Sequence, residues 1–165
     1  MKPTYLETWY RLDGQVAGLL SIVSDMDGVV VDSNGSVLSF TTRVALLAYA
    51  AEIGVNLLAS EDDPITLAID LDKLGDRSLD IECQTFSDAW NLFTDVAASV
   101  GELFDVHHPE SNRLYDKLFW GCNLPSVTPA GKWYSPIWSA EELTQLHALM
   151  SVGLNIFRSS VKFRV

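Results

Sequence analysis

Two aspartates near the N-terminus are the residues of this sequence best suited to chemistry. Asp25 and Asp27 follow the apolar run Leu19–Val23, and Gly28 comes directly after them. A carboxylate can attack phosphorus only when a cation shields its negative charge from that of the phosphate. Two such carboxylates could therefore act on a phosphate only together with a bound cation.

The segment from Ile22 to Ser33, IVSDMDGVVVDS, resembles the first motif of the haloacid dehalogenase-like phosphatases. The resemblance implies that Asp25 is the nucleophile, that Asp27 is the general acid and base, and that Mg²⁺ joins the carboxylates to the phosphate. The later family motifs fit poorly, because only about fifteen residues separate Ser60 from Asp76 and a doubly wound sheet needs several long crossovers there. We keep the phosphatase as the alternative function and favour a tight Asp-Gly turn between two strands.

Other reactive side chains give weaker signals. His107 and His108 are adjacent and point apart, so we expect a surface turn rather than a joint metal site. His147 lies beside the apolar stripe of a predicted helix, which favours a packed histidine over a general base. Cys83 and Cys122 lack CxxC spacing and are interpreted as reduced core thiols. Because no phosphate loop, GxSxG or HExxH motif occurs, we expect no catalytic residue, no metal site and no cofactor.

Acidic side chains are concentrated in the middle of the chain. Residues 61–105 hold twelve acidic and two basic residues, a net charge of −10, while the whole chain carries −11. This field repels phosphate backbones, so we expect no direct binding of nucleic acid. It would instead steer a basic partner. The carboxylates predicted to bind that partner are Asp70, Asp72, Asp76, Asp80, Glu82, Asp88 and Asp95.

The element that must position several of these acids is a helix predicted over residues 85–104. Apolar residues recur through it at steps of three and four, which places them on one stripe. Asp88 and Asp95 lie seven residues apart on the other side of the helix. Thr85 is the expected N-terminal cap. The helix would therefore join a large aromatic core to an acidic exterior.

Further helices are predicted from capping residues and from glycine boundaries. One covers residues 40–53, with Thr41 or Thr42 as its cap, and another covers residues 64–74 after the cap Asp63. A third covers residues 113–120. The last runs from a Ser139–Glu142 capping box to Gly153. In the first of these helices, the residues expected to point inward are Val44, Leu47, Ala48, Ala51 and, less clearly, Tyr49.

Strand signals occur mainly in the N-terminal third. Residues 5–12 fit a strand or a short helix, and residues 19–23 and 29–31 fit two strands or one strand and a loop. Residues 161–165 alternate like an edge strand, although a helix continued from Leu154 is also open. The fold class is therefore α+β, with four to five helices packed on a small antiparallel sheet in a single domain over residues 1–165.

The segment Asn123–Pro136 contains three prolines and Gly131, so it must be irregular. Because Trp133 and Tyr134 add much aromatic surface, we expect this segment to pack against the body of the protein. If the two rings are exposed instead, they are alternative anchors for a partner.

The length of 165 residues and the 48% apolar content suit one folded domain with a substantial core. No apolar run reaches the roughly 18 to 20 residues that a membrane span needs. The first ten residues, MKPTYLETWY, contain no long apolar stretch of the kind that a signal peptide carries. We therefore expect a cytoplasmic protein with no membrane partner.

Several segments of the last two-thirds of the chain resemble a known family. WNLFTDV from Trp90, YDKLFWGCNLPSVTP from Tyr115, and PIWS from Pro136 with the following Glu141-Glu142-Leu143 helix are similar to the immunity proteins of enterobacterial contact-dependent growth inhibition (CDI) systems. The resemblance extends over about residues 65–157. It implies a small cytosolic protein that binds and neutralises the C-terminal toxin domain of its cognate CdiA effector without catalysis of its own. Such toxins are often nucleases and usually basic, so an acidic antidote is physically sensible.

Overall fold

Two long strands form the antiparallel hairpin on which the fold is built. In the computed structural model, which describes residues 2–77, 80–104 and 109–164, β1 (Thr4–Leu12) pairs along its whole length with β2 (Gln15–Val23). β3 (Gly28–Val29) pairs antiparallel with β2, and β5 (Ile69–Asp70) pairs parallel with β1, in the order β3-β2-β1-β5. The sheet is thus mixed rather than purely antiparallel, because the chain returns to β1 through a long crossover and then runs in the same direction.

A second, two-stranded sheet joins distant parts of the chain. β4 (Val37–Ser39) pairs parallel with β6 (Val161–Phe163), and Phe40 exchanges two backbone hydrogen bonds of 2.8 Å with Gly18 of β2. The C-terminal segment is therefore tied to the hairpin through β4.

Neighbouring residues of β1 are buried on opposite faces of the sheet. Trp9 packs with Leu20 and residues of α1, whereas Tyr10 joins the larger cluster formed with α3 and α5. Gly18 lies opposite Trp9, and a β-carbon there would come within 2.8 Å of the indole ring. Both faces are apolar because both are covered, which explains why alternation in residues 5–12 predicted no single inward face.

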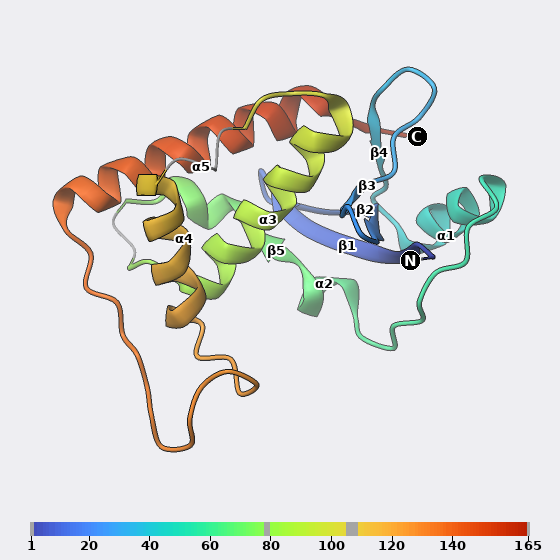
Figure 1. Ribbon diagram of the computed structural model, residues 1–165. Helices are drawn as coiled ribbons and strands as arrows, with labels where there is room; N and C mark the ends of the chain where they lie inside the picture. Colours follow the sequence, from blue (N-terminus) through green and yellow to red (C-terminus); the bar gives the residue numbers. More distant parts are fainter. Residues whose placement is uncertain (1, 78–79, 105–108, 165) are drawn as a thin grey trace.

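Five α-helices occur within the described residues, which confirms the α+β class. Figure 1 shows α3 and α5 crossing one side of the sheet, with α4 next to α3 and α1 on the far side of β1. None of these helices has both the length and the apolar character required to cross a bilayer. The helices are α1 (Arg43–Glu52), α2 (Pro64–Leu67), α3 (Cys83–Val100), α4 (Pro109–Gly121) and α5 (Ala140–Ser160), with a short 3-10 helix, η1 (Leu71–Gly75).

Three of the predicted helix caps are confirmed and one is wrong. Thr42, Asp63 and Ser139 each accept a backbone hydrogen bond at the start of a helix, and Ser139 forms the reciprocal capping box. Thr85, in contrast, lies inside the first turn of α3. Its hydroxyl donates to Oε1 of Glu82, the residue that precedes the helix, at 2.8 Å.

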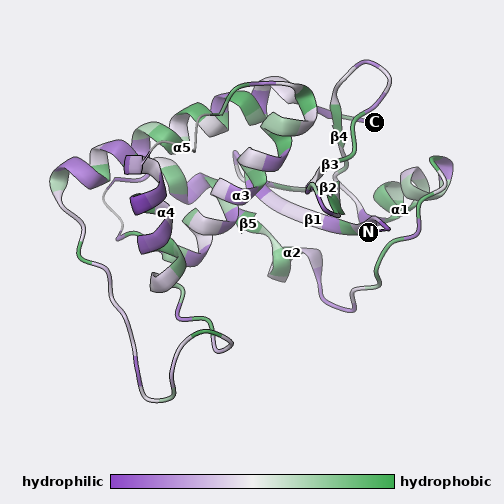
Figure 2. Ribbon diagram, in the orientation of Figure 1, coloured by the Kyte–Doolittle hydropathy of each residue, from purple (hydrophilic) through white to green (hydrophobic). Residues whose placement is uncertain are grey.

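The inward face predicted for α1 is wrong except for Tyr49, which is buried as expected. The side chains buried there are Leu46, Tyr49 and Ala50, whereas Val44 is 80% exposed and Leu47 is exposed. Figure 2 shows α1 mostly in the colour of hydrophobic residues. A helix that is apolar on all sides has no periodicity to select a face, so its contact with the sheet decides which residues are buried.

The predicted helix over residues 64–74 is interrupted. After α2, Ala68 adopts an extended conformation, and Ile69 pairs with Tyr10 as part of β5 before η1 begins. A gain in sheet pairing at the open edge of β1 therefore outweighs helix continuation in this segment.

The last helix runs past its predicted end. α5 continues through Gly153 to Ser160, and β6 then follows, so the two alternatives considered for the C-terminal segment both occur in succession. Gly153 is buried against Phe93, and a β-carbon at this position would lie 2.3 Å from Cδ2 of the Phe93 ring. The glycine serves the close approach of α5 to α3 rather than helix termination.

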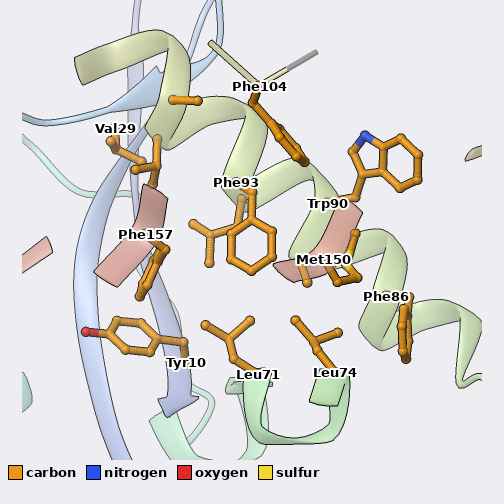
Figure 3. Packing of buried hydrophobic residues seen from close by; sticks show 14 of the residues in the cluster. Tyr10, Val29, Leu71, Leu74, Phe86, Trp90, Phe93, Phe104, Met150 and Phe157 are labelled. Carbon is orange, nitrogen blue, oxygen red and sulfur yellow. The ribbon is translucent and has the colours of Figure 1, made fainter. Parts of the chain in front are cut away.

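Phe93 lies at the centre of the main core. Figure 3 shows its ring between Phe157 on one side and Met150 on the other. Its ring centroid is 6.0 Å from that of Phe157 and 6.4 Å from that of Phe104. The apolar stripe predicted for α3 is thus the face against which α5 and the sheet pack.

Candidate functional site

Asp25 and Asp27 lie in the exposed turn between two antiparallel strands, β2 and β3. Asp27 closes the turn by accepting a 3.0 Å hydrogen bond from the amide of Ser24, which agrees with the turn interpretation. Within the described residues, no group of three or more His, Cys, Asp or Glu side chains is arranged to hold a metal ion. This turn gives the phosphatase hypothesis no support.

The same turn brings Asp27 close to α3. The hydroxyl of Ser99 accepts a 2.9 Å hydrogen bond from the amide of Val29, which attaches the β2–β3 segment to the end of α3. Asp95, one turn earlier on α3, is half-buried, and burial together with the charge of Asp27 raises its pKa from 3.8 to about 6. Among the described residues, none donates a hydrogen bond to Asp95 or pairs with it as a cation.

Asp88 has a similar environment two turns away on α3. Its carboxylate is half-buried, and burial raises its pKa. The side-chain amide of Gln84 donates a 2.8 Å hydrogen bond to it, and no described cation pairs with it. Asp88 and Asp95 are therefore two half-buried carboxylates on one helix, and among the residues that the structure describes no cation pairs with either.

The other predicted binding residues have different surroundings. Asp72 accepts backbone hydrogen bonds from Asp13 and Gly14 at 2.6 and 2.9 Å, and so supports the β1–β2 turn. Asp70 caps η1 by accepting from the amide of Asp72. Glu82 pairs with Lys73 at 2.8 Å, and this hydrogen bond, helped by one from Thr85, lowers its pKa.

Asp76 and Asp80 are exposed between η1 and α3. The structure thus separates the seven predicted acids into three with internal roles, two exposed loop residues, and the α3 pair Asp88 and Asp95.

The basic side chains that form ion pairs in the described part of the chain lie elsewhere. Arg43, Lys117, Arg158 and Arg164 pair with Glu7, Glu142, Asp13 and Glu52, respectively. Lys73 is the base that pairs with one of the predicted acids, Glu82. All the ion-paired bases of the described residues therefore have partners other than Asp88 and Asp95.

A second surface feature was predicted incorrectly from the sequence. We name residues 122–139, which connect α4 to α5, the α4–α5 arm. Trp133 of the arm is 78% exposed and Tyr134 is also exposed, so the expected packing of these rings against the body does not occur. Figure 1 shows the arm extending away from the rest of the fold. The irregular conformation expected for residues 123–136 is confirmed, since no helix or strand lies in them.

The arm is nonetheless held in a defined shape at its base. The side-chain amide of Asn123 donates to the carbonyl of Tyr134 at 2.9 Å, and the amide of Tyr134 donates back to Oδ1 of Asn123 at 2.8 Å. Lys117 donates to the carbonyl of Ile137 at 2.7 Å and lies 5.2 Å from the ring centre of Trp138. These contacts fix both ends of the arm against α4.

The histidines and cysteines have the environments of structural residues where they can be described. His147 is buried, with Nδ1 3.2 Å from the carbonyl of Leu74 and its ring edge-on to Phe86, as expected for a packed histidine. Cys83 and Cys122 are free thiols, and burial raises the pKa of each. His107 and His108 lie outside the described residues.

Comparison with known proteins adds information on the fold alone. No protein-family model and no curated protein matches the chain. A solved structure that is similar is the C-terminal domain of SatS, in a crystal structure described as a complex with bromine. It matches with a TM-score of 0.58 and 10% identity, over 97% of this chain and 94% of that one.

The sequence contained a partial signal for the site. The spacing of the residues placed Asp88 and Asp95 on α3. Their environments depend on tertiary contacts that spacing does not show, namely the hydrogen bond from Gln84 to Asp88 and the approach of Asp27 in the β2–β3 turn to Asp95. The exposure of Trp133 had no local signal, because aromatic residues are more often buried.

Proposed function

We propose that this protein is a cytoplasmic immunity protein that binds and neutralises the basic C-terminal toxin domain of a CDI effector, without catalysis of its own. The observation that best supports this proposal is the pair Asp88 and Asp95, two half-buried carboxylates of α3 with raised pKa values and no described cation. The family resemblance of residues 65–157 supplies the class of partner.

The physical argument rests on the cost of desolvating a charge. A carboxylate removed from water without a positive partner destabilises the folded state, in agreement with the raised pKa of Asp95. Stable proteins retain such groups where function requires them. One lysine or arginine of a bound partner at each carboxylate would neutralise the two charges and convert the penalty into binding free energy.

The spacing of the two charges suits a protein ligand. Seven residues of α-helix correspond to about 10 Å along the axis. A nuclease that engages a phosphate backbone carries several lysine or arginine side chains on one surface. Two basic side chains of such a surface could approach Asp88 and Asp95 together, and the remaining acids of residues 61–105 would accelerate the encounter.

If the gene directly upstream encodes a CdiA effector, calorimetric titration with the C-terminal toxin domain of that effector tests the proposal. The wild-type chain is expected to bind one toxin domain tightly, with an affinity that falls between low and physiological salt. Asp88→Asn with Asp95→Asn should weaken binding while raising the stability of the free protein. Glu61→Gln with Asp62→Asn is the matched control, because it removes the same charge from exposed residues outside the site.

Because the Asn variant is expected to be more stable, weaker binding could not be attributed to unfolding. Equal weakening by both double variants would show that only total charge matters. Absence of binding by the wild-type chain would overturn the proposed function.

A further inference from the structure

The α4–α5 arm exposes an unusual amount of apolar surface. Ile137 is 87% exposed, and Val127, Trp133 and Tyr134 are exposed in the same segment, next to exposed Trp120 at the end of α4. Single exposed apolar residues are ordinary, but several large ones gathered in one short segment are typical of an interaction surface. Tryptophan and tyrosine are also the residues most enriched among those that dominate binding free energy.

The arm is preorganised for contact. Besides the clamps at Asn123 and Lys117, internal turns close with hydrogen bonds from Val127 to Leu124 (3.1 Å) and from Lys132 to Pro129 (3.0 Å). Prolines at three positions of the arm further restrict its backbone. A segment already held in shape loses little conformational entropy when it binds.

The base of the arm lies near Asp88, one of the two half-buried carboxylates of α3. The charge of Asp88 contributes to the raised pKa of Cys122, the first residue of the arm, after the larger effect of burial. Gly121 packs so closely on Cys83, in the first turn of α3, that a β-carbon would lie 2.4 Å from its sulfur. The first residue of the arm therefore lies near the half-buried charge of Asp88.

We propose that the α4–α5 arm is the apolar anchor of the interface with a basic protein domain, with Trp133 and Ile137 entering a pocket on that partner. This inference rests on the proposed function and names the surface that provides its affinity. The partner's pocket would be flanked by lysine or arginine, which meets Asp88 as the arm is buried. The net charge of −11 opposes both an anionic membrane and a second copy of this chain as the occupant.

The arm and the acids are expected to act on different rate constants. Long-range charge controls how quickly the partners meet, whereas buried apolar anchors control how slowly they separate. Loss of the anchors should therefore raise the dissociation rate and leave the association rate nearly unchanged. Loss of the acidic charges should lower the association rate.

Surface plasmon resonance with the upstream-encoded toxin domain as the probe tests this inference on the full chain. Trp133→Ser with Ile137→Ser should raise the dissociation rate by at least about 30-fold. Val44→Ser with Ile65→Ser, two exposed apolar residues of α1 and α2, is the matched control and should change binding by less than about threefold. Urea unfolding of both variants should match that of the wild type.

Each other outcome overturns the inference in a distinguishable way. If the wild type binds tightly and the Trp133/Ile137 variant has the same kinetics, the arm is not the anchor of the interface. The proposed function would remain intact. No binding by the wild type would overturn both. Self-association in sedimentation, or binding to vesicles of anionic phospholipid, that is lost in the same variant would assign the arm to another occupant.

Discussion

The carboxylates of Asp95 on α3 and Asp27 in the β2–β3 turn repel each other across the contact that Ser99 and Val29 make between these segments. Asp95 is half-buried and pairs with no cation among the described residues, and both burial and the charge of Asp27 disfavour its ionised form. Because the folded state raises the pKa of Asp95, this residue lowers the stability of the protein as the pH rises. A salt-bridged aspartate has the opposite effect.

Asp95→Asn is expected to stabilise the protein above pH 6. There the carboxylate is ionised in both states, and only the folded state bears the desolvation penalty, since its pKa is raised from 3.8 to about 6. The gain at pH 7.5 should be about 1–2 kcal/mol, reduced by solvent screening, and should disappear as the pH falls from 6 towards 4. Urea unfolding at pH 7.5 and pH 4.5 measures it, with Asp62→Asn as the control. A gain that is equal at both pH values would contradict the assigned pKa.

Gly153→Ala is expected to destabilise the protein by about 1–3 kcal/mol, because the added β-carbon would collide with the Phe93 ring. At an unconstrained helix position the same change would stabilise by up to about 1 kcal/mol, so the two explanations differ in sign. Chemical denaturation gives the free energy of unfolding. Combination with Phe93→Leu should recover part of the loss, and strict additivity of the two changes would argue against direct contact.

Asn123→Ala should loosen the α4–α5 arm and cost about 1–2 kcal/mol, because both side-chain hydrogen bonds to Tyr134 disappear. Faster tryptic cleavage after Lys132 under native conditions is the expected readout. Asn123 has a positive φ of 49°, so Asn123→Gly separates the lost clamp from backbone strain. If glycine restores wild-type resistance, backbone conformation rather than the clamp holds the arm.

The thiols of Cys83 and Cys122 should react slowly with Ellman's reagent at pH 7.5. Burial raises the pKa of both thiols. The nearby Cys122 raises the pKa of Cys83 further, and the nearby Asp88 raises that of Cys122 further. Because the thiolate is the reactive form, we expect labelling at least about tenfold slower than in 8 M urea. Cys83→Ala isolates the less buried Cys122. Equal rates in the folded and unfolded chains would refute the assignment of both as core thiols.

Features that depend on residues close together in the chain could be predicted from the sequence. Helical periodicity predicts the apolar stripe of α3 that includes Phe93. Local hydrogen bonding accounts for the helix caps Thr42, Asp63 and Ser139 and for the turn closed by Asp27. The placement of Asp88 and Asp95 on one helix follows from the same periodicity.

Which surfaces are buried depends on contacts between segments that are distant in the chain. Because α1 is apolar on all sides, either Val44 or Leu46 could have been buried. Packing of α1 against the sheet buries Leu46 and leaves Val44 exposed. Gly153 could have ended α5, but contact with Phe93 made it an internal packing residue. The exposure of Trp133 and the raised pKa of Asp95, to which Asp27 contributes, depend on groups far away in the chain. Such contacts are non-local, so burial and electrostatic environment could not be predicted from spacing alone.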